Sequence, residues 1–360
     1  VWAQARRKEW AALLPPAEEE FHAVNLTENQ RLLYDSILKE TVDLIEEAMS
    51  KNPELKEALE SGDETLADDL ESMLRPYLVR LERFLSAPET DELSQVFLTA
   101  EADKISPKVR KIHEICQMHL DRNLPGKIVI FTNYTASAEA VFKHAPPELK
   151  KVMIHYTAGR KMECRAEFAR NEKMRIMVGQ SSSMDTGINF QVASRLIRME
   201  TIWTPGTLEQ GNSRINRPQL KKKETRSAVY FDWLMVNRSI DVTKVARLTA
   251  KIISKAKFDN SDTEEYQELP DMPVIPMKIS TIAVQNDFEA ELVPYLEAYN
   301  QMRNVREADY ERYRVENEGK LEPVVVPAGG MLKGSALLQR VPYVPGMTIY
   351  GTDQLGLVRY

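Results

Sequence analysis

Short apolar runs alternate with helical patterns through the middle of the chain. The runs predict strands at Lys127–Thr132, Val152–His155, Arg175–Gly179, Arg195–Met199 and Ala228–Leu234. The helical patterns lie at Pro107–Arg122, Ala136–His144, Arg160–Asn171, Thr207–Arg217 and Ile240–Lys257. Strands that alternate with helices of this length form right-handed crossovers, which predicts an α/β fold with a parallel sheet of five or six strands flanked by helices. Ligands of such sheets bind at the loops that follow the carboxyl ends of the strands.

The regions around this pattern differ in charge. Residues 40–105 form a predicted acidic helical insertion, because Glu40–Asp103 holds 18 Asp and Glu against 5 Lys and Arg in a helix-favouring sequence. We expect its charges to face water. Residues 258–283 are predicted to be an acidic linker with several prolines, and residues 284–360 a small C-terminal module whose role the sequence does not indicate.

Composition limits the class of protein. The 360 residues are 43% hydrophobic and 28% charged, which is typical of a soluble globular protein, and the apolar runs are too short to span a bilayer. Two cysteines, Cys116 and Cys164, cannot form a disulfide framework, so we expect a reducing compartment, cytoplasmic or nuclear. The net charge of −6 argues against wrapping nucleic acid over the whole surface but permits a local basic groove. Because the chain begins at Val1, we expect a piece of a longer protein.

The segment WTPGTLEQGNSRINRPQ, residues 203–219, carries the strongest chemical signal. Pro205 and Gly206 break the chain, and a helix is predicted from Thr207. On that helix Gln210, Arg214 and Arg217 are spaced by four and three residues and so share one face. Guanidinium groups pair with phosphate oxygens in a planar fork, which favours a polyanion ligand. The alternative is an exposed helix with scattered arginines.

A second polar segment, GQSSSMDTGINFQ at residues 179–191, follows a predicted strand. Its serines, Asp185 and Gly187 allow hydroxyls and backbone amides to approach phosphate or sugar oxygens. A polar turn is the alternative for this segment alone. The order of strand, polar loop, strand and arginine helix makes the ligand-binding interpretation stronger than either segment does.

This ordered set resembles the C-terminal RecA-like lobe of superfamily 2 Swi/Snf-type helicases and ATPases. The matching segments are Gly126–Val141 (motif IV), Ser181–Gln219 (motifs V and VI), Leu13–Leu38 (the connection between the lobes), Ser106–Cys116 and Ala228–Lys255. The sequence departs from the family at Met184–Gly187, where Gly-Gly-acid-Gly is usual, and at Glu200 and Ser213. Both motif VI arginines are present.

The resemblance implies a domain order and a function. Residues 1–39 would be the inter-lobe lead-in and residues 106–257 the RecA-like lobe. This lobe would be the second motor lobe of an ATP-dependent DNA translocase or helicase, with double-stranded DNA and a first lobe of the same polypeptide as partners. An inactive lobe that serves as a nucleic-acid or protein interaction module is the alternative, and residues 284–360 would be a possible binding site for a protein partner.

The resemblance also assigns residues. Arg217 and Arg214 would be arginine fingers, with Gln210 beside them, and Asp185, Gly187 and Asn189 would bind the nucleotide. The residues expected to contact nucleic acid are Thr132, Asn133, Ser137, Gly159, Arg160, Ser181, Ser182, Ser183 and Trp203. ATP and Mg²⁺ are the implied cofactors, and Mg²⁺ would be held mainly by the first lobe. The sequence contains neither a Gly-x4-Gly-Lys-Ser/Thr loop nor an Asp-Glu-x-His box, so we expect residues 1–360 alone to be inactive.

His113, Cys116 and His119 share one predicted helix at a spacing of three residues. A tetrahedral zinc site needs a fourth ligand, and no second Cys/His pair stands at a suitable spacing. We therefore expect ordinary packing here and no metal.

Overall fold

The computed structural model describes residues 14–54, 56–57, 67–184, 190–216, 228–275, 288–316, 350–352 and 357–359. The chain divides into two compact units. The larger unit comprises residues 16–216 and 227–309, and the smaller comprises residues 1–15, 217–226 and 310–360. In the smaller unit, β7 (Tyr350–Thr352) pairs antiparallel with β8 (Leu357–Arg359). The larger unit contains the predicted sheet.

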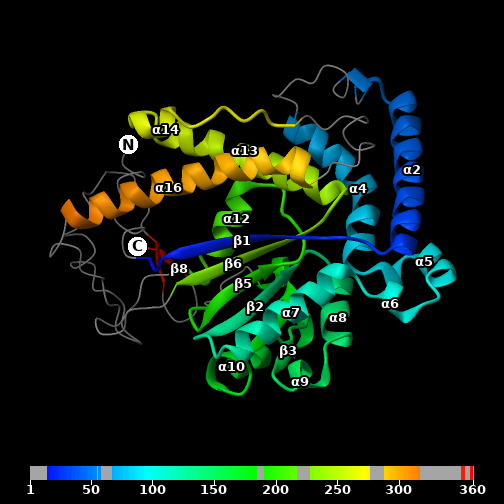
Figure 1. Cartoon of the computed structure of the whole chain (residues 1–360), viewed down its shortest axis with the longest axis horizontal. Helices are drawn as coiled ribbons and strands as arrows, with labels where there is room; N and C mark the ends of the chain where they lie inside the picture. The colour runs from blue at the N-terminus through cyan, green and yellow to red at the C-terminus, as the bar shows by residue number, and fades with distance from the viewer. Residues whose placement is uncertain are drawn as a thin grey trace. The chain divides into compact units, whose positions relative to one another are not determined.

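Six parallel strands form this sheet, in the order β1-β6-β5-β2-β4-β3 (Figure 1). They are β1 (Ala17–Val24), β2 (Lys127–Thr132), β3 (Met153–His155), β4 (Ile176–Gln180), β5 (Ala193–Arg198) and β6 (Val229–Val236). The predicted α/β class is confirmed, and five strands lie at the predicted runs. The sixth, β1, comes from the lead-in and pairs with β6 along its whole length, from Ala17 opposite Val229 to Val24 opposite Val236.

Helices cover both faces of the sheet, because alternate strand residues point to opposite sides. On one face, Ile128 and Ile130 pack in a cluster with α7 (Pro107–Asp121) and α8 (Thr135–Lys143). On the other, Val129 and Phe131 pack with residues of α10 (Lys161–Arg170). Further helices around the sheet are α9 (Pro147–Lys150), α11 (Ser181–Met184), α12 (Pro205–Asn212) and α13 (Ile240–Asp259). Both strand faces are therefore buried, which explains why the runs read as continuously apolar.

The acidic insertion forms a helical layer whose buried cluster also includes Val236 of β6 and Ile240 of α13. Its elements are α2 (Glu28–Lys51), α4 (Ala67–Ser86), the short helix η2 (Pro88–Thr90), α5 (Glu92–Phe97) and α6 (Glu101–Lys104). Helix α2 begins at a capping box formed by Thr27 and Gln30, before the predicted boundary at residue 40. Leucines and aromatic residues of α2 and α4 pack together in one buried cluster. The expectation that all charges of the insertion face water is wrong for Glu82 and Asp103, which are buried.

The region after the sheet, up to residue 309, is packed within the larger unit. Helix α14 (Glu264–Gln267) lies in the segment predicted to be a linker, yet Tyr266 and Leu269 are buried in a cluster with α13 and α16 (Val293–Glu316). A π-helical turn, η4 (Phe288–Leu292), precedes α16, which runs beside α13 (Figure 1). The compact units therefore do not follow the predicted boundary at residue 284. Among the described helices, none has both the length and the apolar character that a membrane crossing requires.

Candidate functional site

Three loops meet at the carboxyl edge of the sheet, after β2, β4 and β5. The side-chain amide of Gln180, at the end of β4, donates to the carbonyl oxygen of Asn133 at 3.0 Å. The backbone amide of Asn133, after β2, donates to Oε2 of Glu200, after β5, at 2.8 Å. Burial raises the pKa of the Glu200 carboxyl, while Lys108 and the Ser137 hydroxyl lower it. These hydrogen bonds fix the three loops to one another.

Helix α12 follows the third loop and is shorter than predicted. It is capped by Thr204, whose hydroxyl accepts from the Thr207 amide, and it runs from Pro205 to Asn212. Ser213 leads into a turn, and its hydroxyl donates to the Gln210 carbonyl at 2.7 Å. In the turn, the Arg214 carbonyl accepts from the Phe190 amide at 3.0 Å, which joins this turn to the segment before β5. Arg214 therefore lies in the turn beyond the end of α12, and its amide donates to the Gly211 carbonyl at 3.2 Å.

The motif VI side chains differ in environment. Gln210 is exposed on α12, and Arg214 is half-buried in the turn that follows. Among the described residues, the buried Nε of Arg214 has no hydrogen-bond partner. Arg217 lies outside the described residues, as do Asp185, Gly187 and Asn189. Phe190 is the first described residue after residues 185–189. The hydrogen bond from its amide to the Arg214 carbonyl connects the motif V segment to motif VI.

A buried arginine that the sequence analysis did not single out anchors α12. Arg198, at the end of β5, is only 3% exposed, and its Nη2 donates to Oδ1 of Asn212 at 2.6 Å and to the Leu208 carbonyl at 3.4 Å. Gly211 permits this contact, since a Cβ atom there would lie 2.7 Å from Nη2. The sequence contains a signal for this contact: an arginine at the end of an apolar strand, followed by a glycine inside the next helix.

Two of the residues predicted to contact nucleic acid are buried. The Thr132 hydroxyl lies within hydrogen-bond distance of the Tyr134 and Gly179 carbonyl oxygens, at 3.0 and 3.3 Å. Ser137 is fully buried beside Glu200. Neither side chain faces solvent, so both hold the loop after β2 and neither can touch a backbone phosphate in this arrangement. Asn133 is half-buried, with its amide group 3.4 Å from the Thr201 carbonyl.

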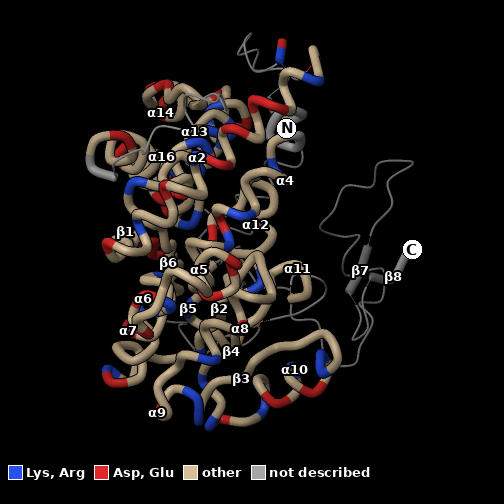
Figure 2. The backbone as a smooth tube through the Cα atoms, turned by 90° about the vertical axis from the view of Figure 1, so that its right-hand side faces the viewer, with Lys and Arg blue, Asp and Glu red and all other residues tan. Residues whose placement is uncertain are grey.

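The other predicted contacts lie nearer the surface. Gly159 and Arg160 are exposed in the short helix η3 (Ala158–Arg160), and Arg160 pairs with Glu163 through two hydrogen bonds, at 2.9 and 2.5 Å. Ser181, Ser182 and Ser183 form most of α11 (Ser181–Met184), with Ser182 exposed and the other two half-buried. In Figure 2, α10, α11 and α12 follow one another along one side of the sheet. Trp203 is half-buried beneath Lys244.

One group of possible metal ligands occurs among the described residues: Glu20, His22 and Asp232. His22 Nε2 lies 2.9 Å from Asp232 Oδ1, and Arg195 Nη1 donates to both carboxylate oxygens at 2.8 Å. Because the guanidinium already neutralises Asp232 and would repel a cation, we interpret this group as a buried ion pair.

The three residues weighed as a zinc site make other contacts. His113 Nε2 lies 2.9 Å from the Val141 carbonyl, and His119 Nε2 lies 3.4 Å from the Gly126 carbonyl. Burial lowers the pKa of His119 to about 4 and raises that of the Cys116 thiol. Each side chain is thus accommodated by packing and backbone contacts.

Residues 110–219, which include β2 to β5, α12 and the motif VI arginines, match the family model of the helicase conserved C-terminal domain. This part of the chain is a helicase C-terminal domain. The predicted RecA-like lobe is thereby confirmed, with its parallel sheet and flanking helices. No curated protein matches the chain by sequence.

Several solved structures resemble this chain. The C-terminal part of the Fun30 ATPase domain is 15% identical, with a TM-score of 0.42 over 63% of this chain and 88% of that one. The Sulfolobus solfataricus SWI2/SNF2 ATPase core in complex with dsDNA is 18% identical, with a TM-score of 0.44 over 71% of this chain and 48% of that one. The Pyrococcus furiosus Hef helicase domain is 17% identical, with a TM-score of 0.39 over 64% and 57%. The chain thus spans about half the length of the Sulfolobus core.

Proposed function

We propose that this chain is the second motor lobe of an ATP-dependent DNA translocase of the Swi/Snf type. Its helicase domain would supply Arg217 and Arg214 to a nucleotide site shared with a first lobe of the same polypeptide. The observation that carries the proposal is the anchoring of α12 by Arg198. A buried guanidinium that holds the helix from within the sheet fixes where the motif VI segment begins, as catalysis by a positioned cation requires.

The chemistry fits a phosphate ligand. Phosphoryl transfer depends mainly on positioning and on charge stabilisation, and one arginine finger contributes about 10³–10⁵ in rate. The Nε of Arg214, which has no partner in the part of the chain that the structure describes, is a donor suited to a phosphate oxygen. Asp185, Gly187 and Asn189 would line the nucleotide from this lobe, with Gln210 next to the arginines. Mg²⁺, which neutralises the β- and γ-phosphates when bound, would be held mainly by the first lobe.

The proposed DNA contacts go to the backbone of the duplex. Arg160 and Ser182 are exposed, and the backbone amides of η3 around Gly159 and of α11 at Ser181–Ser183 would offer further donors. Asn133 and Trp203 would lie at the edge of this surface. Contacts of this kind position a duplex without reading its sequence, which suits a motor that moves along DNA.

The test uses the full-length protein. Arg217→Ala should lower DNA-stimulated ATP turnover by about 10³-fold or more, with a smaller change in ATP affinity, since a finger acts on transition-state charge. Gln210→Ala and Arg214→Ala should lower turnover as well. The matched control is Arg122→Ala, an exposed arginine that caps α7 at the opposite edge of the sheet. A change within a factor of two for Arg217→Ala would contradict the assignment.

The isolated chain provides a second test. Residues 1–360 should not hydrolyse ATP measurably, and they should bind duplex DNA weakly, without sequence preference. Binding should weaken strongly between about 50 and 200 mM salt, because it rests on a few phosphate contacts. A filter-binding titration across this range, with an ATPase assay on the same sample, measures both. Robust hydrolysis would overturn the two-lobe arrangement, whereas absent or salt-insensitive DNA binding would favour an inactive interaction module.

A further inference from the structure

Helix α4 of the acidic insertion ends against the carboxyl edge of the sheet with a buried charge. Glu82 is 3% exposed, and its Oε1 lies 2.8 Å from Nζ of Lys244, on α13, which is 1% exposed. Removing two charges from water costs free energy that their attraction repays only when the geometry is well defined. The pair therefore indicates a fixed position for α4 against α13.

The second oxygen of Glu82 holds the loop after β2. The hydroxyl of Tyr134 donates to Oε2 of Glu82 at 2.6 Å. Burial and the neighbouring Glu82 charge raise the pKa of Tyr134, so its hydroxyl remains a donor at neutral pH. Tyr134 follows Asn133 directly, and this bond places the insertion in contact with the loop predicted to approach DNA.

Lys244 extends the same network to the loop after β5. Its Nζ lies 4.4 Å from the centroid of the Trp203 ring, within the range of a cation–π interaction. Because Lys244 forms an ion pair with Glu82, the Glu82 carboxylate determines where the Lys244 ammonium lies over the Trp203 ring. Glu82 thus contacts one of the two loops directly and the other through Lys244.

We infer that Glu82 is a positioning residue through which the acidic insertion sets the geometry of both loops for DNA binding. The part of this inference that concerns DNA rests on the proposed function. The insertion then supports the nucleic-acid surface from within, since α4 carries the carboxylate that contacts one loop directly and the other through Lys244.

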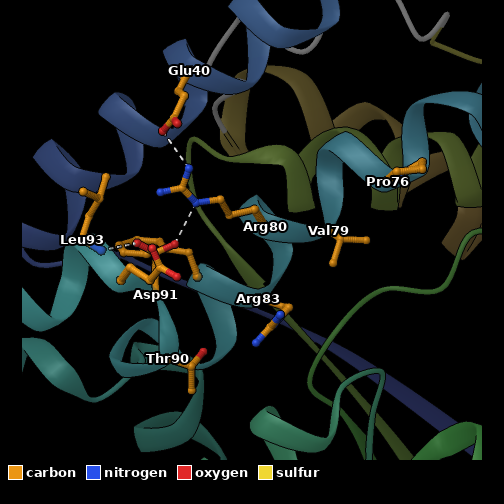
Figure 3. Close-up of a pocket in the computed structure, with 10 residues that line it drawn as sticks. Glu40, Pro76, Val79, Arg80, Arg83, Thr90, Asp91 and Leu93 are labelled. Atoms are coloured by element: carbon orange, nitrogen blue, oxygen red, sulfur yellow. Dashed lines mark hydrogen bonds and ion pairs between the residues drawn. The ribbon is translucent and has the colours of Figure 1, made fainter.

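Arg80, two residues before Glu82 on the same helix, provides a matched control. Its guanidinium pairs with Glu40 at 2.7 Å and with Asp91 at 2.8 Å, at the margin of a pocket of about 570 Å³ within the insertion (Figure 3). Arg80 is more than a third exposed. Both of its partners belong to the insertion, so its loss should leave the loops after β2 and β5 unchanged.

The experiment compares the whole chain, residues 1–360, with three variants. Glu82→Leu with Lys244→Met replaces the buried pair by apolar side chains, a change that buried ion pairs often tolerate. Tyr134→Phe removes one hydroxyl and keeps the pair. Arg80→Met is the control. Hydrogen exchange of residues 130–137 and 199–207 measures the two loops, and fluorescence anisotropy with a labelled duplex measures DNA affinity.

In the double variant we expect exchange in both loops to rise by about tenfold, since local opening becomes easier. Its affinity for the duplex should fall by about tenfold, which is about 1.4 kcal/mol. Tyr134→Phe should loosen residues 130–137 alone, by about threefold, and it serves as the decisive variant if the double variant does not fold. Arg80→Met should change neither measurement.

Two results would overturn the inference: unchanged loop exchange in a folded variant, or loosened loops with unchanged DNA affinity. Failure of the proposed function looks different, because the unmodified chain would then not bind the duplex at all. In that case, faster hydrogen exchange of the loops in the Glu82 and Tyr134 variants alone still supports the positioning role within the fold. Unchanged exchange in those variants excludes that role.

Discussion

Two buried regions of the larger unit consist of opposite kinds of residue: the apolar interior between the sheet and helices α7 and α8, and the carboxyl edge of the sheet. In the interior, Ile128, Ile130 and Ile197 are 0% exposed and meet only apolar neighbours within their cluster. At the carboxyl edge, Lys108 and Asp241 form an ion pair at 2.6 Å, with both side chains at most 1% exposed. The interior gains free energy from any well-packed apolar side chain, whereas each charge at the edge requires one particular partner.

This difference assigns separate tasks to the two regions. Apolar packing stabilises the fold without specifying loop positions to a fraction of an ångström. Three buried charged side chains each form a hydrogen bond with a residue outside their own element: Glu82, Glu200 and Arg198. Together they fix the loops that carry the candidate site. The edge pairs, more than the interior, should therefore be sensitive to removal of a single partner.

The largest effect is expected for Lys108→Met. It leaves the Asp241 carboxylate buried without its cation, which should lower the free energy of unfolding by about 3–5 kcal/mol. Adding Asp241→Asn removes the charge and keeps an acceptor for the Val236 amide, at 3.0 Å in the native protein, so most of the loss should be recovered. Urea denaturation of the single and double variants measures both. A single-variant loss below about 1 kcal/mol would remove the distinction between edge and interior.

The same distinction explains what the sequence could predict. Apolar periodicity located β2 to β6, because burial on both faces leaves a continuous apolar run. It missed β1, whose AEEEFHAV segment lies at the sheet edge with two glutamates exposed. It extended α12 too far, because the backbone bond between Phe190 and Arg214 joins distant segments.

The residue roles at the candidate site show the same limit. Local spacing marked the loops after β2, β4 and β5, but it could not show that Thr132 and Ser137 are buried within them. The partners of Arg198 and Glu82 lie on other elements, and pairings of that kind leave no local periodicity. The order of the motifs therefore predicts which loops form the candidate site, and tertiary contacts determine which of their side chains are exposed there.

An acid-induced loss of stability is expected from His119, at the amino end of the sheet. Its folded-state pKa is about 4, against about 6.5 in an unfolded chain. The unfolded state therefore binds more protons between these values, so stability falls as the pH drops from about 6.5 toward 4. The loss should approach about 3 kcal/mol at pH 4, and His119→Gln should flatten this part of the profile. Equal pH profiles for His119→Gln and the unmodified chain would contradict the prediction.

A smaller effect is expected in the interior. Ile197→Val removes one methylene from a fully buried side chain and should cost about 1 kcal/mol. It should leave DNA binding unchanged, because no charged contact at the carboxyl edge is lost. Thermal unfolding and the duplex titration on the same sample measure the two quantities. A marked loss of DNA affinity with this small loss of stability would mean that apolar packing also sets the loop geometry.

Arg160→Gln should have the smallest effect on stability and a specific effect on binding. Its guanidinium is exposed and pairs only with Glu163 one turn away among the contacts described above, so thermal unfolding should not change measurably. If Arg160 contacts a phosphate, one released counterion is lost, and the slope of log K against log salt should become shallower by about 0.9. Glu163→Gln is the matched variant: it frees Arg160 from its partner, so binding should tighten while the slope is kept. An unchanged slope in Arg160→Gln would exclude η3 from the DNA path and leave α11 and the loops braced by Glu82 as the proposed contact surface.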